Sequence, residues 1–398
     1  MGTIDPQVWE LRTPAFILKE DELRGDISGF QKALSSRFSE SIVGYSVKTN
    51  SLPYSLSIAR EEGCYAEVVS YHEYELAIKC GFEKSHIIYN GPLKSRETFL
   101  DAITNGAIVN IETWREIEWL EDLPKENIWP VGIRMNIDIS HVSPEDADHE
   151  EDDSRFGFSA KSGDLKEALR RIRSLSHVKL TGLHIHRTSK ARQVSFYSHS
   201  IQYAIEVIDS YGIDPSYIDV GGGYFGPMPG KPTFEDYARA IQEALGSKYA
   251  DLKVIVEPGN ALVASVFDYI MSVIDVKQHN HKTYITTDGT RNDVDPFFHK
   301  SSYFWTPLTR GEREKSDAPQ VIGGLTCLEY DRLMELEPGT SALRVGDRIH
   351  LERVGAYTMA LTPLFIHYFP IVYSKCGDTF RVIRQEWGAE EFIQKSIY

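Results

Sequence analysis

The chain has 398 residues, of which 41% are hydrophobic and 25% charged, and its formal net charge is −15. This profile is typical of a globular protein of about two domains. The negative charge argues against nucleic acid as a partner, and no apolar run approaches the roughly 20 residues of a membrane-spanning helix.

The four cysteines indicate a reducing compartment. Cys64, Cys80, Cys327 and Cys376 form no CxxC pair and show no disulfide-like spacing. The first residues contain neither a basic n-region nor an apolar h-region, so no signal peptide is predicted. We therefore expect a cytoplasmic protein.

Residues 40–262 alternate short β-branched or aromatic runs with longer stretches of helical periodicity, several of which end in glycine. The eight apolar runs are residues 42–47, 65–69, 87–89, 108–111, 131–135, 180–185, 217–220 and 254–256. Eight strand–helix units favour a (β/α)8 barrel, with its active site at the C-terminal ends of the strands. An open doubly wound sheet is the alternative, but no GxGxxG follows the first run.

The pattern changes after residue 265. Segments such as YIMSVIDVKQ, KTYITTDG and TFRVIRQ are strand-like, with Gly and Asp turns between them. The opening TPAFILKEDEL is also strand-like and should pair into the same domain. The sequence thus predicts an α/β barrel over 36–264 and a β-sandwich or β-barrel domain from 1–35 and 265–398.

An acidic stretch, PEDADHEEDD, occupies residues 144–153. Charge runs of this kind are usually solvated surface loops. A lid over a cationic substrate is the alternative interpretation.

Two predicted strand ends carry candidate catalytic side chains. The first strand ends in YSVKTN, which directs Lys48 toward the mouth of the barrel, where partial burial lowers the pKa of a lysine and makes it nucleophilic. The eighth is followed by EPGN, so Glu257 lies on the rim; a carboxylate facing a pyridine nitrogen keeps that nitrogen protonated. Taken alone, Lys48 is better explained as a surface lysine beyond a strand end, and the later motifs change that balance.

The sixth strand ends in GLHIHRTSK, with His184, His186 and Arg187. No metal site that uses both histidines is predicted, although one ring suits stacking on a flat cofactor. The seventh ends in DVGGGYFG. Its glycines let backbone N–H groups approach an anion, whereas a simple tight turn is the alternative; they are Gly221, Gly222 and Gly223.

These motifs occur together in a specific order: YSVKTN, GLHIH, DVGGGY, EPG, TCLEYD and GAYT. In this order the chain resembles the decarboxylases of the alanine-racemase-like fold that depend on pyridoxal-5′-phosphate (PLP). These include the diaminopimelate, ornithine, arginine and carboxynorspermidine enzymes. The resemblance covers almost the whole chain, from TPAFIL to GAYT, and also includes EVVSYHEYELA, YNGPLKS, RMNIDI and SRFGF.

The resemblance implies a role for each matching residue. Lys48 would hold the cofactor covalently, His184 would stack on its ring, and Glu257 would pair with the ring nitrogen. The residues implied to hold the phosphate are Gly221, Gly222, Gly223 and Tyr357. Cys327 would come from the neighbouring subunit of a head-to-tail homodimer and protonate the substrate; an inert buried thiol is the alternative.

Four positions depart from the family pattern. HIGS becomes HIHR, which places Arg187 where the family has a serine, and EPGR becomes EPGN, which places Asn260 where it has an arginine. We expect these two changes to compensate for each other, with Arg187 supplying the cation. In TCLEYD, Leu328 replaces an acid, as in the branch with CTPLD-type motifs, whose substrates are often siderophore precursors or carrier-bound amino acids.

The fourth departure concerns substrate choice. Asp295 stands where the diaminopimelate enzymes place an arginine that binds a substrate carboxylate, and it would repel that carboxylate. The sequence therefore predicts an amino-acid substrate other than diaminopimelate. Its candidate binding residues are Asp295, Leu328, Glu329 and Asp331.

Three other functions are alternatives to decarboxylation. A racemase or epimerase on this fold would use a tyrosine opposite the lysine as a second base. A non-catalytic regulatory homologue should have lost Lys48 or Cys327, and both are present. A metal-dependent barrel hydrolase would need ligands spread over several strand ends.

Overall fold

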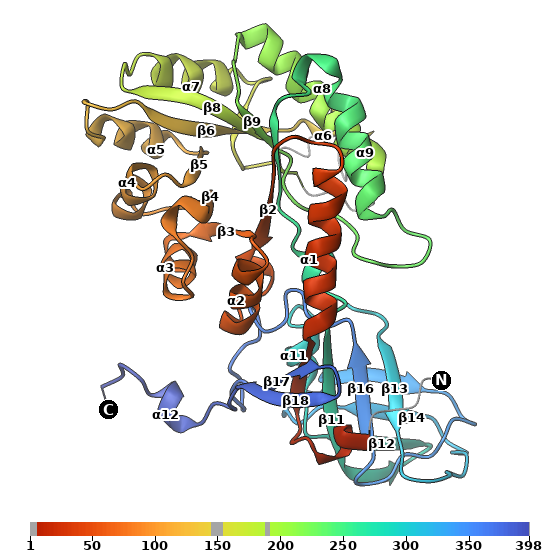
Figure 1. The fold of residues 1–398 in the computed structure, drawn as a ribbon. Helices are drawn as coiled ribbons and strands as arrows, with labels where there is room; N and C mark the ends of the chain where they lie inside the picture. Colours follow the sequence, from red (N-terminus) through yellow and green to blue (C-terminus); the bar gives the residue numbers. More distant parts are fainter. Residues whose placement is uncertain (1–5, 145–153, 188–191, 398) are drawn as a thin grey trace. The chain divides into compact units, whose positions relative to one another are not determined.

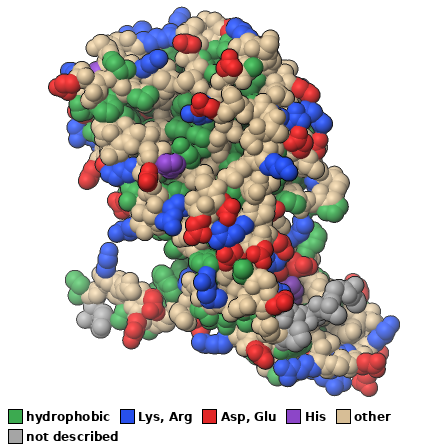
Figure 2. All heavy atoms as spheres, in the orientation of Figure 1, with side chains coloured by type: hydrophobic (Ala, Val, Ile, Leu, Met, Phe, Trp, Pro, Cys, Tyr) green, Lys and Arg blue, Asp and Glu red, His purple; other side chains and the backbone are tan. Residues whose placement is uncertain are grey.

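The computed structural model describes residues 6–144, 154–187 and 192–397, which form two compact units (Figure 1). Residues 24–262 make up one unit, and residues 1–23 with 263–398 make up the other. Almost all of the acidic stretch 144–153 lies outside the described residues. Figure 2 shows acidic and basic side chains interspersed on the face drawn. No helix of the described segments is long and apolar enough to cross a membrane.

The first unit is the predicted barrel. Its eight parallel strands are β2 (Ser41–Ser46), β3 (Tyr65–Ser70), β4 (Ile87–Leu93), β5 (Ile108–Ile111), β6 (Trp129–Asn136), β8 (Val178–His184), β9 (Tyr217–Asp219) and β10 (Lys253–Val256). The barrel is closed, because β10 pairs with β2 and the remaining strands pair in order, β5 with β6 included. The prediction of a (β/α)8 barrel is confirmed, and the open doubly wound sheet is excluded.

Helices follow the strands in the order that the periodicity predicted. They are α2 (Pro53–Glu61), α3 (Tyr71–Lys79), α4 (Arg96–Thr104), α5 (Trp114–Trp119), α7 (Asp164–Arg173), α8 (Val194–Tyr211) and α9 (Phe234–Leu245). The short helices α6 (Ile139–Val142) and α10 (Asn260–Val263) and the short strand β7 (Phe158–Ser159) also belong to this unit. Side-chain caps fix several starts: Ser70 accepts from Glu73 N at 3.2 Å, and Thr233 forms a capping box with Asp236. Gly212, in the left-handed region, ends α8.

The second unit is built on a mixed sheet. Its strands are β1 (Ala15–Lys19), β11 (Phe267–His279), β12 (Lys282–Thr287), β13 (Phe304–Leu308), β14 (Gln320–Gly323), β15 (Arg332–Leu336), β16 (Arg348–Glu352), β17 (Ile371–Cys376) and β18 (Thr379–Arg384). The N-terminal strand β1 lies between β11, to which it is antiparallel, and β17, to which it is parallel. Two short helices, α11 (Arg291–Val294) and α12 (Ala389–Phe392), complete the unit.

The division between the units differs from the expected one at its N-terminal side. It falls at residue 23, within α1 (Glu20–Ser35), whereas the sequence placed it at residue 35. The reason is packing: Phe30 is fully buried, stacks on Phe234 of α9 at 4.5 Å and meets Tyr224 edge-on at 5.1 Å. Most of α1 therefore belongs with the barrel.

Candidate active site

Three of the residues singled out from sequence lie at the C-terminal ends of barrel strands. Lys48 lies in a 3-10 turn (Val47–Thr49) directly after β2, His184 is the last residue of β8, and Glu257 follows β10. The C-terminal ends of parallel barrel strands meet at one rim. The closed barrel thus brings these side chains into the same region.

Lys48 is held by a buried carboxylate. Its Nζ donates to Glu67 Oε2 at 2.6 Å and to Ser46 Oγ at 2.9 Å, and Ser46 Oγ in turn donates to Glu67 Oε2 at 2.7 Å. The side chain of Glu67 is 1% exposed and that of Lys48 is 33% exposed. The amine is therefore positioned by charge-assisted hydrogen bonds while it remains accessible.

Two asparagines link the carboxylates inside the barrel. Asn90 Nδ2 donates to Glu257 Oε1 at 2.5 Å and to Glu67 Oε1 at 3.3 Å. Asn110 Nδ2 donates to Asn90 Oδ1 at 2.8 Å and to Asp219 Oδ2 at 3.3 Å. The lysine end and the Glu257 end of the site are thus parts of one hydrogen-bonded network.

The sequence analysis missed Glu67, Asn90, Asn110 and Asp219. Each is a polar residue within or at the end of an apolar run: YAEVV, IIYNG, IVNI and YIDV. A single polar residue in a strand that is buried on both faces is a usable signal, because such a group needs a partner inside the barrel.

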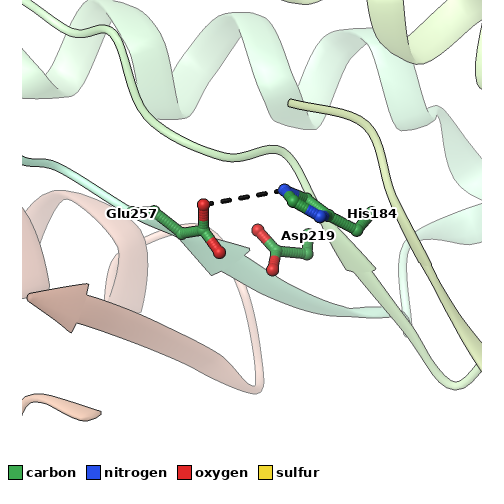
Figure 3. Close-up of side chains that lie close together, drawn as sticks. All are labelled: His184, Asp219 and Glu257. Carbon is green, nitrogen blue, oxygen red and sulfur yellow. Dashed lines mark ion pairs between the residues drawn. The ribbon is translucent and has the colours of Figure 1, made fainter. Parts of the chain in front are cut away.

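His184, Asp219 and Glu257 form a fully buried cluster (Figure 3). His184 Nε2 lies 3.6 Å from Glu257 Oε2. Among the described residues neither ring nitrogen of His184 has a hydrogen-bond partner. Burial holds the pKa of His184 well below its usual value, so the imidazole is neutral. Burial, together with the adjacent Glu257 carboxylate, raises the pKa of Asp219 well above its usual value.

The same cluster has the spacing of a metal site, which the sequence did not predict. One donor atom from each of His184, Asp219 and Glu257 lies within 4.8 Å of the others. A divalent cation would, however, need Asp219 deprotonated. Asp219 Oδ1 also accepts from Gly221 N at 3.0 Å, and Glu257 Oε1 accepts from Asn90. The donor set is thus partly used within the protein.

The loop after β9 requires glycine at all three of its positions 221–223. Gly221 and Gly223 have φ of +69° and +97°, and a Cβ on Gly221 would lie 2.5 Å from His186. A Cβ on Gly222 would lie 2.4 Å from the backbone oxygen of Glu257. Gly222 N donates to His186 Nδ1 at 3.1 Å, and burial lowers the pKa of His186 to about 3. Gly223 remains as the glycine whose N–H no described residue accepts.

The region around Asn260 contains an arginine that the sequence analysis did not select. Asn260 begins α10, directly after Glu257-Pro258-Gly259. With its amide oxygen turned toward Arg192, Asn260 accepts from Arg192 Nη2 at 2.7 Å and from Nη1 at 3.1 Å. Arg187 is half-buried just beyond β8.

In the second unit, Asp331 is buried, and its carboxylate oxygens already accept hydrogen bonds from other residues of the unit. It accepts from Thr290 Oγ1 at 2.9 Å, from Arg291 N at 2.8 Å, and from Thr326 N and Oγ1 at 3.1 and 2.7 Å. These bonds use the acceptor capacity of the carboxylate. The geometry therefore favours a structural role for Asp331 over the predicted contact with substrate.

Asp295 is engaged in a similar way. Its Oδ2 accepts from Arg291 Nε at 3.0 Å and Nη2 at 2.8 Å, and its oxygens also accept from the backbone N of His299 and of Lys300, each at 3.0 Å. The charge of Asp295 is thus balanced by Arg291. The repulsion of a substrate carboxylate that the sequence analysis expected from Asp295 loses its physical basis.

The remaining candidates of this unit are accessible. Cys327 is an exposed free thiol, which excludes the alternative of an inert buried cysteine. Leu328 is half-buried, and the Glu329 side chain is 96% exposed beside Arg332 at 3.3 Å. Tyr357 is 43% exposed and has a positive φ of 55°, an uncommon backbone conformation for a tyrosine.

A flat, phosphorylated pyridine fits the barrel residues. The orphan imidazole of His184 offers a neutral ring at the base of the site, and Glu257 offers a buried carboxylate beside it. Lys48 supplies an accessible primary amine, and the glycine loop leaves no room for side chains where backbone must approach closely. An amine, a carboxylate and an anion-binding loop at one rim are the groups that PLP requires.

Comparison with known proteins agrees with this assignment. Residues 24–264 match the family model described as "pyridoxal-dependent decarboxylase, pyridoxal binding domain". The chain is 30% identical to a probable chloroplastic diaminopimelate decarboxylase from Oryza sativa subsp. japonica over 366 residues, covering 89% of this chain and 73% of the relative. It is 28% identical to a diaminopimelate decarboxylase from Actinosynnema pretiosum subsp. auranticum, covering 97% and 89%.

Solved structures show the same fold. The diaminopimelate decarboxylase of M. jannaschii superposes with a TM-score of 0.86 at 21% identity, covering 99% of this chain and 94% of that one. The arginine decarboxylase of Paramecium bursaria Chlorella virus gives 0.75 at 18% identity, covering 92% and 96%. Decarboxylation, rather than racemisation or a non-catalytic role, is the activity that the relatives share. This chain therefore belongs to the pyridoxal-dependent decarboxylase family, as a PLP-dependent carboxy-lyase that acts on an amino acid.

Proposed function

We propose that Lys48 is the lysine that binds PLP and that His184, Gly223 and Glu257 hold the cofactor along the barrel rim. The observation that carries this proposal is the hydrogen-bonded network in which the Lys48 amine and the Glu257 carboxylate are joined through Glu67 and Asn90. A network of this kind fixes two distant reacting groups relative to each other before the substrate arrives.

Each side chain has a distinct task in the reaction. When bound, PLP supplies an electron sink for the pair of electrons released as the bond between Cα and the carboxylate breaks. Glu257 holds a proton at the pyridine nitrogen, and Asn90 orients Glu257. His184, neutral because it is buried, covers the ring without adding charge. Lys48 would hold PLP through Nζ and would move protons at that atom, with Glu67 as its counter-charge.

The phosphate end is assigned to backbone and polar groups. The Gly223 N–H and the Tyr357 hydroxyl are proposed to donate hydrogen bonds to the phosphate. The positive φ of Gly223 and the exposure of the Tyr357 side chain support these roles. The N–H groups of Gly221 and Gly222 serve to hold the loop itself.

The substrate is proposed to be an α-amino acid with a second polar group at its distal end. The curated relatives are diaminopimelate decarboxylases, and two of the similar solved structures are complexes with L-lysine. Since Leu328 follows Cys327, the exposed Glu329 is the carboxylate best placed in this motif to meet a distal amino group. CO₂ release from diaminopimelate, lysine, ornithine, arginine and a carrier-bound amino acid would identify the substrate.

We further propose a cytoplasmic homodimer in which Cys327 of one subunit protonates the substrate held by Lys48 of the other. The free, exposed thiol of Cys327 supports this assignment. Lys48→Ala and Cys327→Ala subunits, each inactive alone, should regain about a quarter of wild-type activity when mixed in equal amounts, because half of the dimers then contain one intact site. Mixtures that stay inactive, although differently tagged subunits purify together as mixed dimers, would place both residues of a site in one subunit.

The experiment for the cofactor is the visible absorption spectrum of the purified protein. Wild type should show the band of lysine-linked PLP, borohydride should bleach it, and Lys48→Ala should lack it while retaining its thermal midpoint. Lys84→Ala is a matched control, since Lys84 is also paired with a carboxylate, Asp101 at 2.6 Å. A band that persists in Lys48→Ala, or that is absent from wild type supplied with PLP, contradicts the proposal.

A further inference from the structure

Arg192 is tied to the glycine loop of the candidate site through its backbone and its side chain. Its carbonyl oxygen accepts from Tyr237 Oη at 2.8 Å, and the same hydroxyl accepts from Phe225 N at 3.2 Å. The guanidinium carbon lies 5.3 Å from the centre of the Phe225 ring. Phe225 follows Gly223-Tyr224 directly, so these contacts hold Arg192 at the end of the glycine loop.

The guanidinium also reaches the segment that carries Glu257. Two of its nitrogens lie 2.7 and 3.1 Å from the amide oxygen of Asn260, three residues after Glu257. The two loops touch each other here, because a Cβ on Gly226 would lie 2.5 Å from the backbone oxygen of Ala261. A cation is thereby fixed where the loops after β9 and β10 meet.

The backbone of Arg192 supports a specific purpose. Its φ is +50°, a conformation that a residue with a long side chain seldom adopts. Such a conformation is retained where surrounding contacts determine it, and it is frequent at ligand-binding positions. The bonds from Tyr237 and to Asn260 are the contacts that determine it here.

We infer that Arg192 supplies the positive charge that neutralises the cofactor phosphate, with Asn260 orienting its guanidinium. This inference rests on the proposed function, since it presumes that PLP occupies the barrel rim. A guanidinium presents its N–H donors in a planar fork, a geometry that matches the oxygens of a phosphate. The chain thus has an arginine contributed by one loop and oriented by an asparagine of another.

The test compares PLP with pyridoxal, which has the same ring and aldehyde but no phosphate. Holoenzymes of wild type and Arg192→Met are brought to equilibrium by dialysis, and the occupancy is read from the visible band. The dissociation constant for PLP should rise roughly ten- to hundredfold in Arg192→Met, because a charge-assisted, bidentate contact is lost. The constant for pyridoxal should stay within about twofold of wild type.

Three further variants control the result. Arg192→Lys retains the charge without the fork and should lose less affinity than Arg192→Met. Arg192→Met combined with Asn260→Arg returns a guanidinium to the same place and should recover affinity. Arg239→Met removes a guanidinium from the exposed pair with Asp236 on α9 and should change neither constant.

An unchanged PLP constant in Arg192→Met would overturn the inference, and so would an equal loss for PLP and pyridoxal. If Arg187→Met shows the phosphate-specific loss instead, the cation is Arg187 and the inference is likewise overturned. These outcomes differ from failure of the proposed function, in which the wild type itself shows no PLP band that depends on Lys48. Thermal midpoints of all variants separate loss of binding from loss of folding.

Discussion

Each unit of this chain contains a buried carboxylate, Glu257 in the barrel and Asp331 in the second unit, and the hydrogen bonding of the two differs. In the barrel, the Glu257 carboxylate accepts from Asn90 and lies 3.6 Å from His184, whose own nitrogens have no hydrogen-bond partner among the described residues. In the second unit, Asp331 accepts four hydrogen bonds, two from Thr326 in its own loop and one each from Thr290 and Arg291. Buried polar groups are normally satisfied, so open capacity marks a group that waits for a ligand, and full satisfaction marks a structural one.

This comparison predicts that mutation of Glu257 and mutation of Asp331 change different properties of the protein. Removal of the Glu257 carboxylate should reduce catalysis and leave the fold intact, because few hydrogen bonds of the protein depend on it. Removal of a saturated carboxylate should reduce stability first. Of the following three predictions, the first two test this distinction and the third concerns the pH dependence of stability. They are given in order of decreasing effect.

Glu257→Gln should lower kcat/KM by roughly 100- to 1000-fold, because it removes the charge that keeps the pyridine nitrogen protonated. Its thermal midpoint should stay close to that of wild type. Asp219→Asn, in the same cluster, should cost less than about tenfold, since the raised pKa of Asp219 favours its neutral form, which asparagine resembles. Steady-state kinetics and thermal melts measure both effects. A large loss of stability in Glu257→Gln would contradict the distinction.

Asp331→Asn should destabilise the protein by about 3 kcal/mol, because one amide oxygen cannot replace four accepted hydrogen bonds and the buried amide nitrogen faces donors. Glu329→Gln is the matched control in the same motif: its side chain is 96% exposed, so stability should change by less than about 0.5 kcal/mol. Because Glu329 is proposed to contact the substrate, Glu329→Gln should raise KM while the stability stays unchanged. Equal stability of the two variants in urea melts would refute the structural role of Asp331.

Glu73 should make the stability of the protein depend on pH. Burial, opposed by the hydrogen bond from Val69 N, raises the pKa of Glu73 to about 7, with Glu67 adding to the shift and Lys48 reducing it. The folded state then binds more protons than the unfolded state between about pH 4.5 and 7, so stability falls as the pH rises through this window. Glu73→Gln should remove about 1–2 kcal/mol of this decline while keeping the Val69 bond. Urea melts at pH 5 and pH 7.5 test it; parallel pH profiles for both proteins would reject it.

The same distinction explains which sequence inferences about the site agree with the structure. Lys48, His184 and Glu257 were selected as residues at strand ends, and closure of the barrel brings strand ends to one rim. Asp295 and Asp331 were selected from loops by resemblance alone. Nothing in a loop sequence reveals whether a carboxylate will be used by neighbouring backbone N–H groups, and both of these residues are.

The sequence alone determined the barrel, the β unit and, through the resemblance, the PLP-dependent family, because strand and helix periodicity and the order of the motifs are local properties that survive in a linear chain. Tertiary structure alone decided the network that joins Lys48 to Glu257, which depends on a bond between Asn90 and a residue 167 positions away. It also decided the contact of Arg192 with Asn260 and the boundary within α1. Each of these depends on which distant side chains packing brings within hydrogen-bonding or van der Waals distance, and no periodicity in the sequence encodes that distance.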